Sequence, residues 1–144
     1  MIVLDANILL YAYDVSSARH ATARAWVEET LSSGAPVGLP WQTAAAFVRI
    51  STNAALQGQR FTIEEAARIV DQWIEQPNVR LLAPGEGHWP MFRQMLTEGQ
   101  ACGPLTTDAE LAALTVEFGG VLHSTDRDFA RFPGLRWNNP LESR

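Results

Sequence analysis

The chain has 144 residues, the usual size of one domain, and 47% of them are hydrophobic, which allows one full core and excludes a disordered chain. Sixteen acidic residues outnumber eleven basic ones, so the net charge is −5, and every basic residue is an arginine. Nucleic-acid binding through a broadly positive surface is therefore excluded, and any nucleic-acid chemistry must use bound cations, local arginines or a partner.

The single cysteine, Cys102, excludes an internal disulfide and a cysteine-rich metal site. This fits a reducing compartment, and we expect the protein to be cytoplasmic. The apolar start contains Asp5, has no basic leader, and is shorter than the roughly 20 apolar residues that cross a bilayer. We therefore expect no membrane association and interpret this start as a buried strand that runs into a helix.

The first half of the chain alternates short apolar runs with helical patterns. It predicts a strand at 2–4, helices at 7–13 and 19–31, a strand at 36–39, and helices at 42–51 and 62–76. The first strand is wholly apolar, which is typical of the centre of a parallel sheet. Thr62 and Glu65 form a capping box that opens the last of these helices, and Pro77 ends it.

The second half repeats the same alternation. It predicts strands at 79–82, 121–124 and 135–137, helices at 86–98 and 107–118, and a helical turn at 127–131. Pro90 is compatible with the first turn of its helix. Together the two halves predict an α/β fold of three layers, in which helices flank a parallel sheet of four or five strands, as a single domain over 1–144.

Four aspartates stand where such a sheet binds ligands, beyond the carboxyl ends of its strands. Asp5 follows the first strand, Asp126 and Asp128 follow the strand at 121–124, and Asp108 begins the preceding helix. If these two strands are neighbours, all four carboxylates reach one spot. Because like charges repel, such a cluster favours a bound cation, and carboxylate oxygens suit Mg²⁺ or Mn²⁺. A metal held this way can activate water and stabilise a phosphodiester transition state.

Structural roles compete with this interpretation. Asp108 suits a helix N-terminus, where Thr107 and Glu110 can form a capping box, and Asp126 can cap the turn that follows it. Asp5 has the poorest structural explanation, because acids seldom end buried apolar strands.

Other groups carry weaker signals. Asn7 either orients Asp5 or caps the next helix, and the cap is the simpler interpretation. The three histidines lack metal-ligand spacing, and there is no nucleophile elbow or glycine-rich phosphate loop. The five tryptophans are expected mostly to pack in the core: Trp26, Trp41, Trp73, Trp89 and Trp137.

Three segments resemble the acidic motifs of PIN domains, and in particular those of VapC toxins from bacterial toxin–antitoxin pairs: IVLDAN at 2–7, TDAELAAL at 107–114 and STDRDF at 124–129. The segments FVRISTN at 47–53 and FPGLRW at 132–137 resemble one VapC subgroup, so the resemblance spans the chain. It implies a Mg²⁺-dependent endoribonuclease that cleaves tRNA, rRNA or mRNA and stops growth. It also implies homodimers and a cognate antitoxin that blocks the acidic site.

The resemblance also implies roles for individual residues. By position, Asp5, Asp108 and Asp126 match metal-binding acids, and Asp128 matches an accessory acid. Thr125 matches a position that helps to orient the site. We therefore predict these four aspartates as the catalytic residues of the protein.

One departure from the PIN pattern affects this prediction. Many PIN domains have a glutamate on the helix after the second strand, but here the segment reads QTAAAFVR, and the position falls among Ala44, Ala45 and Ala46. We expect weaker metal binding or one metal in place of two. A catalytically weak or inactive binding module of the same fold is therefore the alternative. A haloacid-dehalogenase phosphatase or a receiver domain needs a lysine near the phosphate, and this chain has none.

Two kinds of partner follow. Arg49, Arg127 and Arg131 are candidates for RNA contact, because a guanidinium pairs with phosphate through two hydrogen bonds, although surface salt bridges explain each equally well. The apolar faces of the helices at 19–31, 42–51 and 62–76 can line a groove for an antitoxin helix, although core burial explains them equally well.

Overall fold

The computed structural model describes residues 1–56, 58 and 60–142. Its elements are β1 (Ile2–Leu4), α1 (Ala6–Tyr13), α2 (His20–Ser32), β2 (Val37–Pro40), α3 (Trp41–Ser51), α4 (Ile63–Ile74), β3 (Val79–Leu82), α5 (His88–Glu98), η1 (Gly103–Leu105), α6 (Thr106–Glu117), β4 (Val121–His123), η2 (Arg127–Arg131) and β5 (Trp137–Asn138). All the predicted strands and helices are present within a few residues of their expected bounds. The short 3₁₀ helix η1 was not predicted. Within the described ranges, no helix has both the length and the apolar character of a membrane span.

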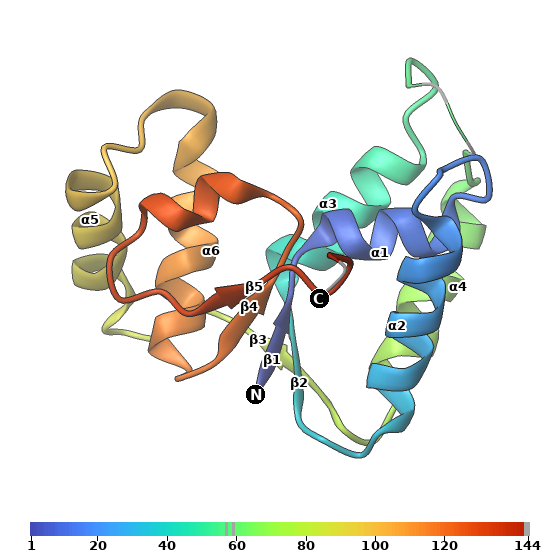
Figure 1. Ribbon diagram of the computed structural model, residues 1–144, viewed down its shortest axis with the longest axis horizontal. Coiled ribbons are helices and arrows are strands. Elements are labelled where there is room, and N and C mark those ends of the chain that lie inside the picture. The colour runs from blue at the N-terminus through green and yellow to red at the C-terminus, as the bar shows by residue number, and fades with distance from the viewer. Residues whose placement is uncertain (57, 59, 143–144) are drawn as a thin grey trace.

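The five strands form one parallel sheet in the order β3-β2-β1-β4-β5. Helices cover both of its faces, which confirms the predicted three-layer α/β fold (Figure 1). The first strand pairs directly with β4, with Leu4 opposite His123. The carboxyl ends of these two strands therefore lie at the same edge of the sheet, as the clustering of the aspartates requires.

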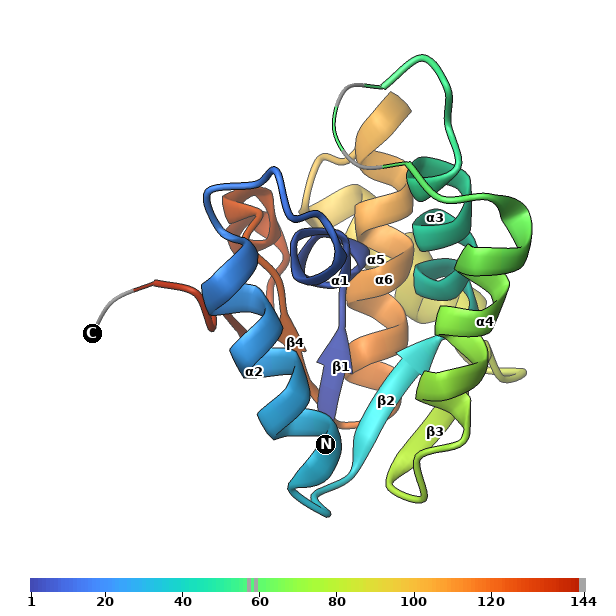
Figure 2. The ribbon, with the colours of Figure 1, turned by 90° about the vertical axis from the view of Figure 1, so that its right-hand side faces the viewer.

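Each face of the sheet buries its own hydrophobic cluster. Val3 and Leu122 pack with α5 and α6, whereas Leu4 and Leu39 pack with α1 to α4. Burial on both faces explains why the central strand β1 is an apolar run rather than an alternating one. Figure 2 shows β1 and β2 pointing toward α1 and α3, so both helices begin at the ligand-binding edge.

The capping box of α4 forms as predicted, with the Glu65 amide donating to Thr62 Oγ1 and the Thr62 amide donating to the Glu65 carboxylate, each at 3.1 Å. Trp73 is buried, and Trp26 and Trp137 are partly buried against the two hydrophobic clusters, so the expectation of core packing is confirmed for these three. Trp41 and Trp89 are 53% and 59% exposed, so the prediction is wrong for them. Each stands in the first turn of its helix, where its side chain meets solvent.

Candidate active site

Asp5 links the end of β1 to the start of α1. Its amide donates to the carbonyl of His123 on β4 at 3.1 Å, which continues the sheet by one residue. Its Oδ1 accepts from the amide of Ala6 at 2.7 Å, so Asp5 is the N-cap of α1. The prediction that Asn7 caps this helix is therefore wrong, because the position is already filled.

Ser124 connects the two strand ends through its hydroxyl. Its Oγ donates to Asp5 Oδ2 at 2.7 Å and accepts from Asn7 Nδ2 at 3.1 Å and from the amide of Asp126 at 3.0 Å. One donor and two acceptor positions are all that a serine hydroxyl offers, and here all three are used. Ser124 is fully buried, so this network fixes Asp5 relative to Asp126.

Sequence reasoning missed Ser124 and assigned the orienting role to Thr125. The described contact of Thr125 is weaker, since its amide donates to Asn7 Oδ1 at 3.4 Å. The available signal was a small hydroxyl residue between the end of β4 and Asp126. Its meaning depended on the pairing of β4 with β1, which is a long-range feature.

Asp108, Asp126 and Asp128 form the tightest group of acids among the described residues. One carboxylate oxygen from each lies within 4.8 Å of the others. Asp126 also caps η2, since its Oδ1 accepts from the amide of Asp128 at 2.9 Å, so the capping and clustering interpretations both hold.

Asp108 lies in the first turn of α6, but the alternative of a local capping box does not form there. The N-cap of α6 is Leu105, and no side chain in the described part of the protein caps the helix. The hydroxyl of Thr107 donates instead to the carbonyl of Pro104 at 3.2 Å. Asp108 therefore takes no part in a capping box. The charged groups that act on it are the other three aspartates and Arg131.

The four aspartates act on one another electrostatically. Burial raises the pKa of Asp108 to about 6, and the negative charges of Asp126, Asp5 and Asp128 add to the increase, while Arg131 opposes it. Burial also raises the pKa of Asp5, although hydrogen bonds from Ser124 and Ala6 oppose this.

This donor set fits a hard divalent cation. Mg²⁺ and Mn²⁺ prefer carboxylate oxygens with water completing the shell, and a cation would remove the mutual repulsion of the acids. The structure brings together all four predicted aspartates but groups Asp128 with Asp108 and Asp126. Asp5 lies beside this group, with both of its oxygens already accepting hydrogen bonds.

The wall of α3 that faces this site contains no acid, as the sequence indicated. Ala45 and Ala46 line the same groove as Asp5 and Asp108. The side chain of Gln42 bridges α3 to α6, since its Nε2 donates to the carbonyl of Thr107 at 3.2 Å. Thus α3 shapes the site but adds no carboxylate to it.

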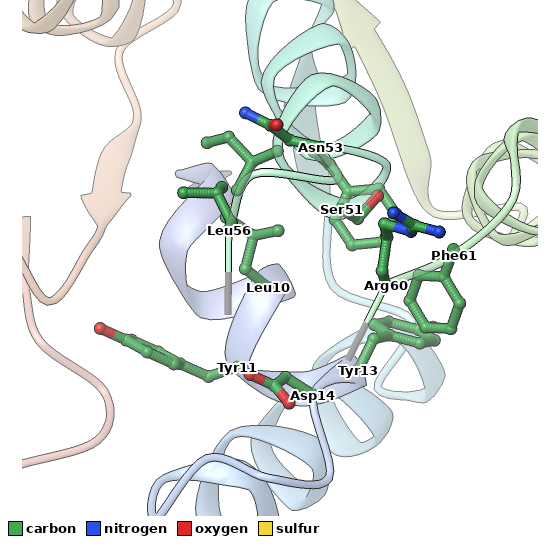
Figure 3. A pocket seen from close by; sticks show the side chains of 11 residues that line it. Leu10, Tyr11, Tyr13, Asp14, Ser51, Asn53, Leu56, Arg60 and Phe61 are labelled. Carbon is green, nitrogen blue, oxygen red and sulfur yellow. The ribbon is translucent and has the colours of Figure 1, made fainter. Parts of the chain in front are cut away.

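A second cavity lies at the other end of α1 (Figure 3). It has a volume of about 110 Å³, and its lining includes Leu10, Tyr13, Arg60 and Phe61. None of the four aspartates lines it. Its location and mainly apolar lining separate it from the acidic site.

Replacing Ser124 with Ala is expected to weaken Mn²⁺ binding by about 10- to 100-fold, because groups that orient metal ligands typically contribute that much. Isothermal titration with Mn²⁺ measures the change. Ser51→Ala is the matched control, since Ser51 is also buried but its hydroxyl has no hydrogen-bond partner among the described residues. Unchanged Mn²⁺ affinity in Ser124→Ala would contradict a positioning role for this hydroxyl.

Replacing Asp108 with Asn is expected to stabilise the metal-free protein at neutral pH. The pKa of Asp108 is about 6 in the folded protein against an ordinary value of 3.8. Stability from its protonation is therefore present below pH 3.8 and lost as the pH rises through about 6. At pH 7.5 the gain in Asp108→Asn should be about 1 kcal/mol, since solvent screens this partly exposed group.

Thermal unfolding in EDTA from pH 4 to 8 measures this difference. The Tm of Asp108→Asn should exceed that of the wild type at pH 7.5, and the gap should narrow toward pH 4. Glu98→Asn, which changes an exposed acid on α5, is the control. A lower Tm for Asp108→Asn at pH 7.5 would show that the acidic cluster is not repulsive.

Sequence comparison places the chain among known proteins. Residues 2–135 match the family described as PIN domain. Ribonuclease VapC33 of Mycobacterium tuberculosis is 37% identical over 98% of this chain and 99% of its own length. Ribonuclease VapC43 of the same organism is 36% identical over 100% of this chain and 98% of its own length.

Solved structures share the fold at lower identity. VapBC2 from Rickettsia felis, bound to a promoter DNA fragment, aligns with a TM-score of 0.70 at 16% identity, over 96% of this chain and 98% of that one. VapC20 of Mycobacterium tuberculosis, described as a toxin that cleaves the sarcin–ricin loop, aligns with a TM-score of 0.67 at 16% identity, over 94% of this chain and 99% of that one. These likenesses independently support the three-layer fold.

Proposed function

The chain belongs to the PIN-domain family, and we propose that it is a Mg²⁺-dependent endoribonuclease that acts as the toxin of a type II toxin–antitoxin pair. Its VapC relatives are named ribonucleases, which supports RNA cleavage as the activity. The observation that carries the proposal is the group of three carboxylates within 4.8 Å, at the sheet edge where β1 and β4 end.

We propose Asp5, Asp108 and Asp126 as the metal ligands, since each Asp5 oxygen accepts only one hydrogen bond and keeps a second lone pair for a cation. Asp128 is the accessory acid, and its carboxylate lies within the same 4.8 Å group as those of Asp108 and Asp126. A bound Mg²⁺ would neutralise the scissile phosphate and lower the pKa of water. Ser124 holds Asp5 and Asp126 in fixed relation through its hydroxyl, so the oxygens need little rearrangement before the phosphate arrives. The cluster remains a repulsive site without a cation, which makes cation uptake favourable.

RNA binding must overcome the net charge of −5. Two of the three arginines predicted to contact RNA have partners within the protein. Arg131 donates to the carbonyls of Gly99 and Gln100 at 3.1 and 3.3 Å, and Arg127 pairs with Glu142 at 3.3 Å. Arg49 forms no ion pair with any residue that the structure describes, so we propose it as the main arginine for RNA.

An antitoxin is the proposed protein partner. A hollow of about 260 Å³ between α2 and α4 includes Tyr13, Leu31 and Trp73 in its lining. An amphipathic helix that inserts apolar side chains fits such a hollow. Solved neighbours of the same fold carry the name VapBC, which supports a toxin–antitoxin pairing.

A homodimer is proposed as well. Trp41 and Trp89 are large apolar side chains that are more than half exposed, and tryptophan is enriched in protein interfaces. Light scattering of the purified protein would test this, and a monomer at micromolar concentration would contradict it.

Induced expression in a bacterial host tests the proposed function. Growth should stop, and sequencing of RNA 5′ ends should reveal defined cleavage sites that are absent when Asp5→Asn is expressed. Co-expression of the small protein encoded beside this chain should restore growth. Normal growth with intact RNA at full expression would contradict the toxin proposal, and arrest that the neighbouring protein does not relieve would contradict the antitoxin part.

A further inference from the structure

A polar pocket of about 220 Å³ lies where the start of α2 meets the residues that follow β4 and β5. We call it the arginine pocket. Its lining combines two arginines with three neutral hydrogen-bonding side chains and one carboxylate: Arg19, Arg127, Thr22, Thr125, Asn139 and Glu142. None of the four aspartates lines it, so the arginine pocket is separate from the acidic cluster.

Arg19 brings a cation without a carboxylate partner to this pocket. It forms no ion pair with any residue that the structure describes. Its guanidinium carbon lies 5.3 Å from the centroid of the Tyr11 ring, a cation–π contact that restricts the position of the side chain. Stacking on a ring face leaves the N–H donors at the edge of the guanidinium available to an anion.

Arg127 brings a second cation, which is only weakly paired. Its Nη2 lies 3.3 Å from Glu142 Oε1, longer than the roughly 2.7–2.9 Å of a strong charge-assisted hydrogen bond. The two side chains are 85% and 56% exposed, and ion pairs this exposed contribute little to stability. An anion in the pocket can therefore replace Glu142 as the partner of Arg127 at small cost.

The remaining groups suit the oxygens of a phosphate. The hydroxyls of Thr22 and Thr125 and the side-chain amide of Asn139 are neutral donors, and Asn139 is held in place because its Oδ1 accepts from the amide of Leu141 at 3.0 Å. The pocket also lies against the first turn of α2, which adds a smaller favourable dipole. Two guanidiniums against one carboxylate leave the pocket positive in a chain whose net charge is −5.

This charge favours a phosphomonoester over a phosphodiester. A monoester carries a charge of about −2 at neutral pH and matches two guanidiniums, whereas a diester carries only one negative charge. We propose that the arginine pocket binds a small phosphomonoester, with Arg19 and Arg127 on its phosphate oxygens and Thr22 and Asn139 beside the group attached to it. The proposal goes beyond the ribonuclease function, since this binding needs no metal ion and no acid of the cluster.

NMR titration of the ¹⁵N-labelled protein in EDTA tests this, with glycerol phosphate and inorganic phosphate as probes. The amide signals of Thr22, Thr125 and Arg127 should shift most. Arg19→Gln and Arg127→Gln should each weaken the affinity for both probes about fivefold or more, because each removes a charge-assisted hydrogen bond. Arg24→Gln is the matched control and should bind as the wild type does, since Arg24 also lies on α2 but pairs with Glu28 outside the pocket.

Glu142→Gln should change the affinity in the opposite direction. It removes the carboxylate that competes for Arg127, so glycerol phosphate should bind about threefold more tightly. Dimethyl phosphate, a diester with a single charge, should bind about tenfold more weakly than glycerol phosphate and stands for the backbone of a nucleic acid. Adding Mg²⁺ should leave the affinity for glycerol phosphate unchanged.

Several results would overturn the arginine pocket. Wild-type affinity in both Arg19→Gln and Arg127→Gln, or an equal loss in Arg24→Gln, would place the phosphate elsewhere. Binding that appears only with Mg²⁺ would place it at the acidic cluster, and equal affinity for dimethyl phosphate would assign the pocket to a phosphodiester. These measurements involve no RNA cleavage, so the ribonuclease function can fail while the pocket stands, and the reverse also holds.

Discussion

Replacing Asp126 with Asn is expected to lower the rate of RNA cleavage by about 100-fold or more. A bound metal contributes several kcal/mol to a phosphodiester transition state, and each 1.4 kcal/mol or so is a factor of ten. Asp126 belongs to the tight group of acids and also adds to the raised pKa of both Asp5 and Asp108. Its negative charge therefore acts on both of the other acids whose pKa is raised.

Asn is the informative replacement because it keeps the local structure. Its carbonyl oxygen can still accept from the amide of Asp128, so the cap of η2 remains. The rate of RNA cleavage by the purified variant measures the loss of activity. A thermal melting curve of the same sample shows whether the variant is still folded, so an effect of the lost charge can be told from unfolding. Asp71→Asn, on the exposed face of α4, serves as control. Cleavage at the wild-type rate by folded Asp126→Asn would remove Asp126 from the catalytic residues.

The second large effect is on stability. Replacing Trp73 with Ala is expected to lower the free energy of unfolding by about 3–5 kcal/mol, the usual cost of removing a buried aromatic side chain. Trp73 is 2% exposed and packs edge to face against Phe47 at 4.7 Å and Tyr13 at 5.8 Å between ring centroids. Its Nε1 donates to the hydroxyl of Tyr13 at 3.0 Å, so one residue joins α4 to both α1 and α3.

Urea unfolding of the isolated protein measures this loss. Ile63→Ala is the control on the same helix, because Ile63 is 69% exposed and its truncation should change stability by about 0.5 kcal/mol or less. A loss below about 1 kcal/mol in Trp73→Ala would show that α4 is held to the rest of the protein by other contacts.

Local signals predicted much of the fold. The capping box at Thr62 and the apolar run at 2–4 marked their elements correctly because each depends on residues close in sequence. The strand-end position of Asp5 also pointed to the edge of the sheet where the structure brings the four aspartates together. That prediction assumed that β1 and β4 are neighbours in the sheet, and the structure shows that they pair directly.

Features that join distant segments were not predictable in the same way. The Ser124 hydroxyl gains its role from Asp5, which lies 119 positions away in the chain. Tryptophan is a residue type that usually packs in a core, and only the packing of whole helices determines that Trp41 and Trp89 are exposed. The same limit applies to Gln42, whose Nε2 meets the carbonyl of Thr107 only when α3 and α6 are placed together.

RNA cleavage by the purified protein, with divalent cations removed and restored, tests the central claim most directly. The four aspartates repel one another without a cation, so we expect no cleavage in EDTA and cleavage at defined positions once Mg²⁺ or Mn²⁺ is in excess. Asp126→Asn should remain inactive at the same metal concentrations. Cleavage that continues undiminished in EDTA, or that is equal in the wild type and Asp126→Asn, would contradict a metal-dependent ribonuclease site at the ends of β1 and β4.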